Sequence, residues 1–197
     1  MFQGIKMRPM KNETLAQRLG TTAHLSPLLM KAQRLGLCVP EDFERLAVRR
    51  GLRYYDCLPN SAIIQEEAAT YCGEPATDLL SNEELAAALA SPSFQYSQLR
   101  LRMAAAVLAT EGNSPEELAR LARQERCEAV FVHIARCGAK VEPDHQFWKT
   151  LLAQLPPLPE APPDLLPHIT RFVAMTGVTR RGKETVMQWI RPRRLAA

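Results

Sequence analysis

The sequence predicts an all-α protein: a multi-helix bundle or a stack of short helices, with a proline-rich spacer and a small basic C-terminal unit. The apolar residues are mostly Leu and Ala, which favour helices, rather than the β-branched and aromatic residues that favour strands. Helix-capping signals recur along the chain, and the connections between them are as short as those between packed helices. With 197 residues, of which 46% are hydrophobic, the chain can bury a substantial core.

The N-terminal region, residues 1–76, is expected to hold four helices. Each starts at a residue that suits a helix N-terminus, and the first three stop at a glycine. Between the third and the fourth, residues 51–60 fit either a short strand or a buried connection. The expected starts are Asn12, Ser26-Pro27, Pro40 and Ser61, and the expected stops are Gly20, Gly36 and Gly51.

The central region, residues 77–155, is expected to form a helical stack. Two of its helices begin at capping signals, Ser81 with Glu84 and Ser114 with Glu117. Further helices are expected over residues 95–110, 127–137 and 144–155. Each helix has one apolar stripe, which we expect to face the core. The expected core residues are Leu85, Leu89, Leu118, Leu121, Phe131, Ile134, Trp148 and Leu152.

Residues 156–167 form a proline-rich linker between the central region and the C-terminal unit. Six prolines lie within residues 155–167, a density that excludes a helix and favours an extended, semi-rigid segment. The segment also contains a PxxP pattern from Pro159 to Pro162, which is typical of peptides that dock into aromatic-lined grooves. We interpret it as a spacer laid along the helical body, with a docking motif as the alternative.

The C-terminal unit, residues 168–197, concentrates the positive charge of the chain. It contains seven basic residues and one acidic residue, a net charge of +6, whereas the whole chain carries only +4. The rest of the chain is therefore slightly acidic. The basicity belongs to one surface, which indicates an acidic partner such as nucleic acid.

Within this unit, the sequence resembles the helix-turn-helix module of DNA-binding proteins. Such modules have an apolar first helix, a turn that begins with glycine, and a recognition helix that enters the major groove. The spacing departs from that of the module by three additional residues, 182–184. The corresponding parts are Phe172, Val173 and Thr176 in the first helix, the turn Gly177-Val178-Thr179, and the recognition helix Thr185–Ile190.

The resemblance implies a set of residues that contact nucleic acid. Most are cations, which would lie beside phosphates, and the Gln188 amide suits bidentate reading of adenine. The alternative is a terminal amphipathic helix that packs Val186, Trp189 and Ile190 onto the body. The implied contact residues are Thr179, Arg180, Arg181, Lys183, Gln188, Arg191, Arg193 and Arg194.

Other motifs are incomplete. Gly177, Gly182 and Lys183 match part of a phosphate-binding loop, but Glu184 stands where Ser or Thr would hold magnesium. We considered a metal site formed by Cys127, His133, Cys137 and His145. Since helical spacing assigns Cys127 to the apolar stripe, away from His133, we expect neither a metal nor another cofactor. The sequence contains no recognisable catalytic motif.

These observations predict a non-enzymatic, nucleic-acid-associated helical protein that binds DNA more readily than RNA. The alternative is a helical adaptor that holds an acidic protein partner, and an enzyme of unfamiliar type ranks third. We expect the protein in the cytoplasm and not in a membrane. The five cysteines lack the spacing of a disulfide framework, and no apolar run approaches the length of a membrane span.

Overall fold

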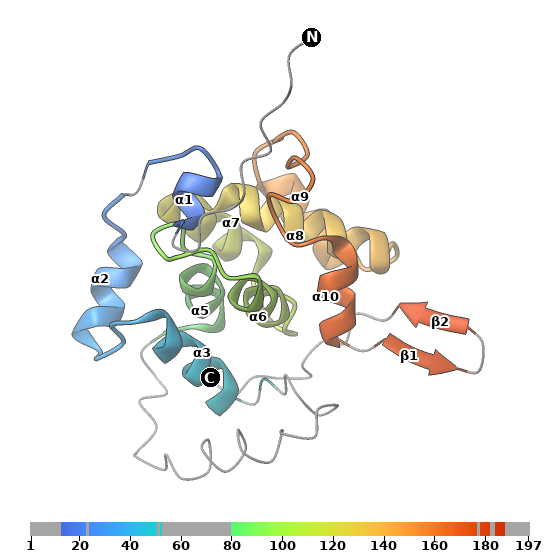
Figure 1. Ribbon diagram of the computed structural model, residues 1–197, viewed down its shortest axis with the longest axis horizontal. Coiled ribbons are helices and arrows are strands. Elements are labelled where there is room, and N and C mark those ends of the chain that lie inside the picture. Colours follow the sequence, from blue (N-terminus) through green and yellow to red (C-terminus); the bar gives the residue numbers. More distant parts are fainter. Residues whose placement is uncertain are drawn as a thin grey trace.

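The computed structural model describes residues 13–22, 24–50, 52, 80–176, 178–181 and 184–187. Nine helices and two short strands occur within these ranges, so the prediction of an all-α body is confirmed for the described part (Figure 1). The helix expected after Ser61 and the segment 53–60 lie outside it. No described helix is long and apolar enough to cross a bilayer.

Three short helices form the N-terminal part: α1 (Leu15–Arg18), α2 (Pro27–Arg34) and α3 (Pro40–Arg49). The start of α1 differs from the expectation. Thr14 caps this helix instead of Asn12, because the Thr14 hydroxyl accepts from the Gln17 amide at 3.2 Å and the Gln17 side chain bonds back to the Thr14 amide at 2.8 Å. Ser26 caps α2 as expected, accepting from the Leu29 amide at 2.9 Å.

Five helices follow one another in the central region. They are α5 (Asn82–Leu89), α6 (Gln98–Leu108), α7 (Pro115–Glu125), α8 (Glu128–Val141) and α9 (Gln146–Gln154). Ser81 and Ser114 cap α5 and α7, which confirms both predicted starts. Buried alanines in α5 and α6 lack bulky side chains, so these two helices can approach each other closely.

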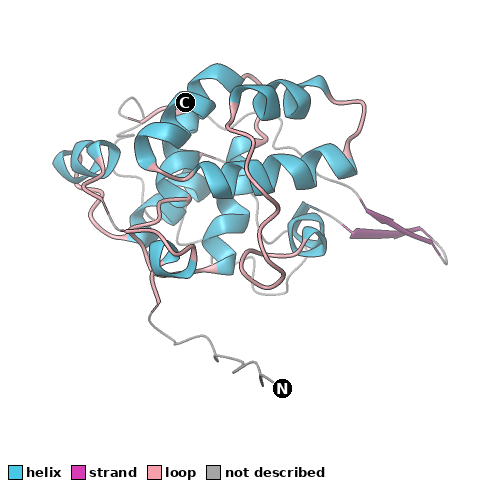
Figure 2. Ribbon diagram, turned by 90° about the horizontal axis from the view of Figure 1, so that it is seen from above, coloured by secondary structure: helices cyan, strands magenta, loops and turns pink. Residues whose placement is uncertain are grey.

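The helices pack around one core, and several neighbours in space are not neighbours in the sequence. Helix α5 packs on α6 and α7, α7 packs on α9, and α9 packs on α8, while α3 covers α5 and α6 (Figures 1 and 2). The expected core is confirmed at seven of its eight positions. Leu152 is only half-buried, because Trp148 and Leu151 define the inward stripe of α9 and Leu152 lies at its edge.

The contact between α8 and α9 depends on Gly138. A Cβ atom at this position would lie 2.3 Å from Cε2 of Trp148 and 2.4 Å from its Cδ2, well inside van der Waals contact. The indole ring, which is fully buried, therefore lies directly on the α8 backbone. Its Nε1–H donates to the Glu142 carboxylate at 2.6 Å, which fixes the orientation of the ring.

Replacing Gly138 with Ala is expected to destabilise the fold by about 1–3 kcal/mol, because the new methyl group overpacks the α8–α9 contact. The free energy of unfolding in denaturant measures this effect. The matched control is the double variant Gly138→Ala/Trp148→Phe, in which the smaller ring leaves room for the methyl group. Its loss should be smaller than the sum of the two single losses, and strict additivity would contradict the contact.

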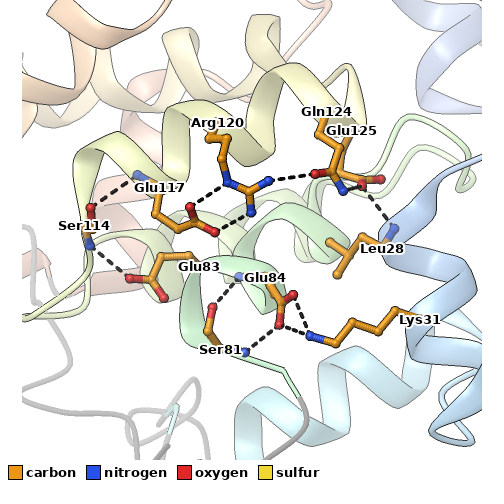
Figure 3. A network of polar contacts seen from close by, with 10 residues as sticks. All are labelled: Leu28, Lys31, Ser81, Glu83, Glu84, Ser114, Glu117, Arg120, Gln124 and Glu125. Carbon is orange, nitrogen blue, oxygen red and sulfur yellow. Dashed lines mark hydrogen bonds and ion pairs between the residues drawn. The ribbon is translucent and has the colours of Figure 1, made fainter.

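A buried carboxylate joins α7 to the start of α2. Glu125 is 1% exposed, yet it accepts from the Leu28 amide at 3.1 Å and from the Ser26 hydroxyl. The Gln124 side chain donates to it as well, at 3.0 Å. The same polar network continues through α5, where Glu84 pairs with Lys31 of α2 at 2.7 Å (Figure 3). Polar side chains thus attach the N-terminal helices to the stack.

Replacing Glu125 with Ala should cost about 2–4 kcal/mol, since two buried donors at the start of α2 lose a charged acceptor. Denaturant unfolding measures the loss. Glu125→Gln keeps one acceptor oxygen and should cost less. Glu111→Ala removes an exposed carboxylate between α6 and α7 and should be nearly neutral. Equal losses for the Glu125→Ala and Glu111→Ala variants would show that the buried carboxylate does not hold α2.

The C-terminal unit differs from its prediction. Helix α10 (Ile169–Thr176) is present, but β1 (Val178–Arg181) and β2 (Glu184–Met187) then form an antiparallel hairpin. The prediction that a recognition helix starts at Thr185 is therefore wrong for residues 185–187, and residues 188–190 lie outside the described part. The reason is local. β-Branched residues occupy facing positions of both segments, and such residues favour strands.

Candidate nucleic-acid interface

The proline-rich segment, residues 155–167, lies along the helical body. Since proline has no N–H, this segment cannot complete a helix or a strand ladder, and its carbonyl groups need other donors. Arg136 of α8 supplies two of them. Its Nη1 donates to the Pro159 carbonyl at 3.1 Å and its Nη2 donates to the Leu158 carbonyl. A carbonyl within the PxxP pattern is thus engaged by the body, which fits a spacer better than a docking motif.

A second arginine holds the far end of the segment. Arg18 of α1 donates through Nε to the Leu165 carbonyl at 2.5 Å and through Nη2 to the Asp164 carbonyl. Its guanidinium lies over the ring of Tyr96, 4.0 Å from the centroid, a cation–π contact that fixes its position. Asp164 has a left-handed backbone, with φ of 69°, and turns the chain towards α10.

His133 of α8 connects the segment to α10. Its Nε2 lies 2.8 Å from the Pro167 carbonyl, so this nitrogen carries the hydrogen and donates it. Its ring also packs against Phe172 of α10, with centroids 5.7 Å apart. Burial lowers the pKa of His133 below its usual value, although the bond to Pro167 acts in the opposite direction. The neutral imidazole is therefore the form that the fold favours.

The thiols beside His133 are not activated. Cys137 lies 3.9 Å from His133 Nε2, but burial raises its pKa to about 11. Burial also raises the pKa of Cys127, which is fully buried at the start of α8. His145 caps α9 by accepting from the Phe147 amide at 3.2 Å. The four candidate ligands do not converge, and no group of three or more such residues occurs in the described part of the chain.

A cleft of about 790 Å³ lies between α8 and the proline-rich segment, and it extends to the start of α10. Its lining residues come from five parts of the chain: α1, α6, α8, the proline-rich segment and the start of α10. Its charged residues are the cations Arg18, Arg136, Lys140 and Arg171 and the acids Glu160 and Asp164. These four cations and two acids give a net charge of +2.

Sequence reasoning missed this cleft, although one signal for it exists. His133, Arg136, Cys137 and Lys140 recur at spacings of three and four residues, which puts them on one face of α8. A polar and cationic stripe next to a proline-rich segment indicates a helix that presents donors to its carbonyl groups. The remaining lining, from α1, α6 and α10, carries no comparable signal.

Helix α10 supports the hairpin on one side of the molecule. Phe172 is 1% exposed, and α10 packs on α6 and α8. The hairpin follows α10 and projects away from the helical body in both views (Figures 1 and 2). In its register, Thr179 is opposite Val186, Arg180 is opposite Thr185, and Arg181 is opposite Glu184.

The predicted contact residues divide into two groups. Thr179, Arg180 and Arg181 lie together on β1. The other five lie outside the described residues: Lys183, Gln188, Arg191, Arg193 and Arg194. Lys183 is one of the two residues between the strands, so its position in the chain is at the hairpin connection.

Comparison with known proteins found no relative of this chain. The chain matches no protein family, and no curated protein or solved structure matches it. The fold and the site therefore define the class directly: an all-α body with an arginine-held proline-rich segment, a cationic cleft and a projecting basic hairpin.

The lowered pKa of His133 predicts that acid destabilises the fold. Below about pH 6.5 the unfolded chain binds a proton at this residue, whereas the folded chain binds it only at lower pH, so stability falls as pH falls. A single proton contributes at most about 1.4 kcal/mol per pH unit. Measured between pH 7.5 and 5, the free energy of unfolding should fall less steeply in His133→Gln. The matched control, His168→Gln, replaces an exposed histidine. Identical slopes for the wild type and His133→Gln would contradict the prediction.

Proposed function

We propose that the protein binds nucleic acid through its basic C-terminal unit, residues 168–197, with cations on the phosphate backbone and DNA favoured over RNA. The charge of this unit, +6 in thirty residues, supports the proposal because phosphate contacts dominate the affinity of such complexes. In this proposal the helical body serves as the base of the unit, and the Cys137 thiol in the cleft is not activated, because burial raises its pKa to about 11.

The observation that carries the proposal is the projecting hairpin. A two-stranded β-ribbon fits the major groove of B-form DNA, which is about 12 Å wide, and several DNA-binding proteins use strands in this way. The β1–β2 ribbon has Arg180 and Arg181 in its first strand and Lys183 at its connection. The deep, narrow major groove of A-form RNA does not admit such an element, which supports the preference for DNA.

The attachment of the hairpin also supports the proposal. Phe172 anchors α10 in the core, and Pro167, just before α10, is held by His133. Arg171 is exposed on the same helix. Eight residues of helix extend about 12 Å. The hairpin therefore follows a helix of about this length, whose first half is held by the body.

The salt dependence of duplex binding tests this function. The logarithm of the binding constant should fall by about 0.9 per neutralised phosphate for each tenfold rise in salt. Deleting residues 191–197 removes Arg191, Arg193 and Arg194 and should flatten this slope by up to about 3 units. The double variant Arg180→Ala/Arg181→Ala should flatten it by up to about 2 units.

Two exposed cations far from the unit supply the controls. Arg34→Ala on α2 and Lys149→Ala on α9 remove the same charge and should leave the slope unchanged. If the hairpin variants and the controls change the salt slope equally, the binding depends only on the net charge of the protein, and the proposal is contradicted. Failure of the intact protein to bind duplex even at low salt would favour the adaptor, whose basic tail holds an acidic protein.

A further inference from the structure

The size of the cleft suits a small ligand. Its volume of about 790 Å³ lies within the roughly 300–1,000 Å³ that is usual for small-molecule sites. It is separate from the hairpin, because it lies at the start of α10 whereas β1 begins after the end of that helix. Its two long walls, α8 and the proline-rich segment, are held together by the two bonds from Arg136.

One side of the cleft offers donors to an anion. The side chain of Arg171 makes no hydrogen bond or ion pair among the described residues. Lys140 lies 3.8 Å from Glu160, and since both side chains are mostly exposed, this pair is weak enough to exchange for a ligand. Arg136 uses two of its five N–H donors on the proline-rich segment. Three cations therefore retain donors.

Apolar residues also line the cleft. Ala161, Pro162, Pro163, Leu166 and Ile169 line it. Planar bases are bound against apolar and aromatic side chains in many nucleotide pockets, where their faces leave water. The carboxylates of Glu160 and Asp164 lie in the same lining and can accept from the exocyclic amino group of a base.

We propose that this cleft binds one nucleotide with a terminal phosphate monoester, its phosphate on Lys140, Arg136 and Arg171 and its base against the proline-rich segment. The charge fits this class, because the net +2 of the cleft equals the charge of one phosphate monoester, about −1.5 to −2 at neutral pH. A nucleoside triphosphate carries more negative charge than the cleft neutralises. A free nucleoside monophosphate and the phosphorylated end of a strand share the required chemistry. Binding of either in the cleft is a different activity from duplex binding by the hairpin.

Isothermal titration of the full-length protein with adenosine 5′-monophosphate tests the site. We expect saturable binding, with adenosine and inorganic phosphate each at least about tenfold weaker, since each lacks one half of the contacts. Inorganic phosphate that binds as well as the nucleotide would reduce the cleft to a general anion site. Adenosine that binds as tightly as the nucleotide would show that the cations do not contribute to binding. Either result overturns the proposal.

Variants of the exposed cations locate the binding. Lys140→Ala/Arg171→Ala should weaken the nucleotide at least about tenfold without unfolding, because the one ion pair that this variant removes, between Lys140 and Glu160, is exposed and weak. Glu160→Gln should strengthen it, since Lys140 then loses its competing partner. Lys149→Ala on α9 is the matched control and should bind normally. Unchanged binding in the double variant would overturn the proposal.

Competition identifies the source of the nucleotide. A 5′-phosphorylated tetranucleotide that displaces adenosine 5′-monophosphate, while its unphosphorylated form does not, supports the end of a strand as the ligand. A tetranucleotide that fails to displace it supports the free nucleotide. Absence of saturable binding by both ligands overturns the proposal. A protein that binds the nucleotide but not duplex contradicts only the function proposed for the hairpin, and the opposite result contradicts only the nucleotide site.

Discussion

The side of the molecule that carries the cleft and the hairpin depends on how the carbonyl groups of one proline-rich segment are hydrogen-bonded. A segment with six prolines in residues 155–167 lacks the donors for regular structure, so donors from the helical body determine its path. Arg136, Arg18 and His133 supply them at three successive points. The path that they impose forms one wall of the cleft and sets where α10 begins. The hairpin takes its position from α10 in turn.

The helical body can serve as a base because two contacts restrict its freedom. Gly138 lets the Trp148 ring rest on the α8 backbone, so α8 and α9 pack at one close separation. Glu125 joins α7 to the start of α2 from a fully buried position. Since His133 and Arg136 lie on the same helix as Gly138, the packing of α8 against α9 also determines where the donors of the cleft lie.

Local signals explain which parts were predictable from the sequence. Caps such as Ser26, Ser81 and Ser114, each followed by an apolar stripe, located the helices and nearly all of the expected core. The hairpin was missed because Thr185–Met187 alone fits a helix or a strand, and the facing segment decides between them. Residues 182–184, which the helix-turn-helix spacing could not accommodate, contain the connection between the strands. The cleft could not be predicted, since its walls come from residues as distant as Arg18 and Arg171.

The position of His133 has a mechanical consequence. Force on the hairpin passes to α10, which packs on α6 and α8. The Phe172 ring and the Pro167 carbonyl before this helix both contact the His133 imidazole. Helix α8, which carries the imidazole, is clamped by Trp148 on its other contact. Force on the hairpin is therefore resisted in part by α8, a central helix of the body. Displacement of α10 would also move the part of the cleft that is lined by its first turn.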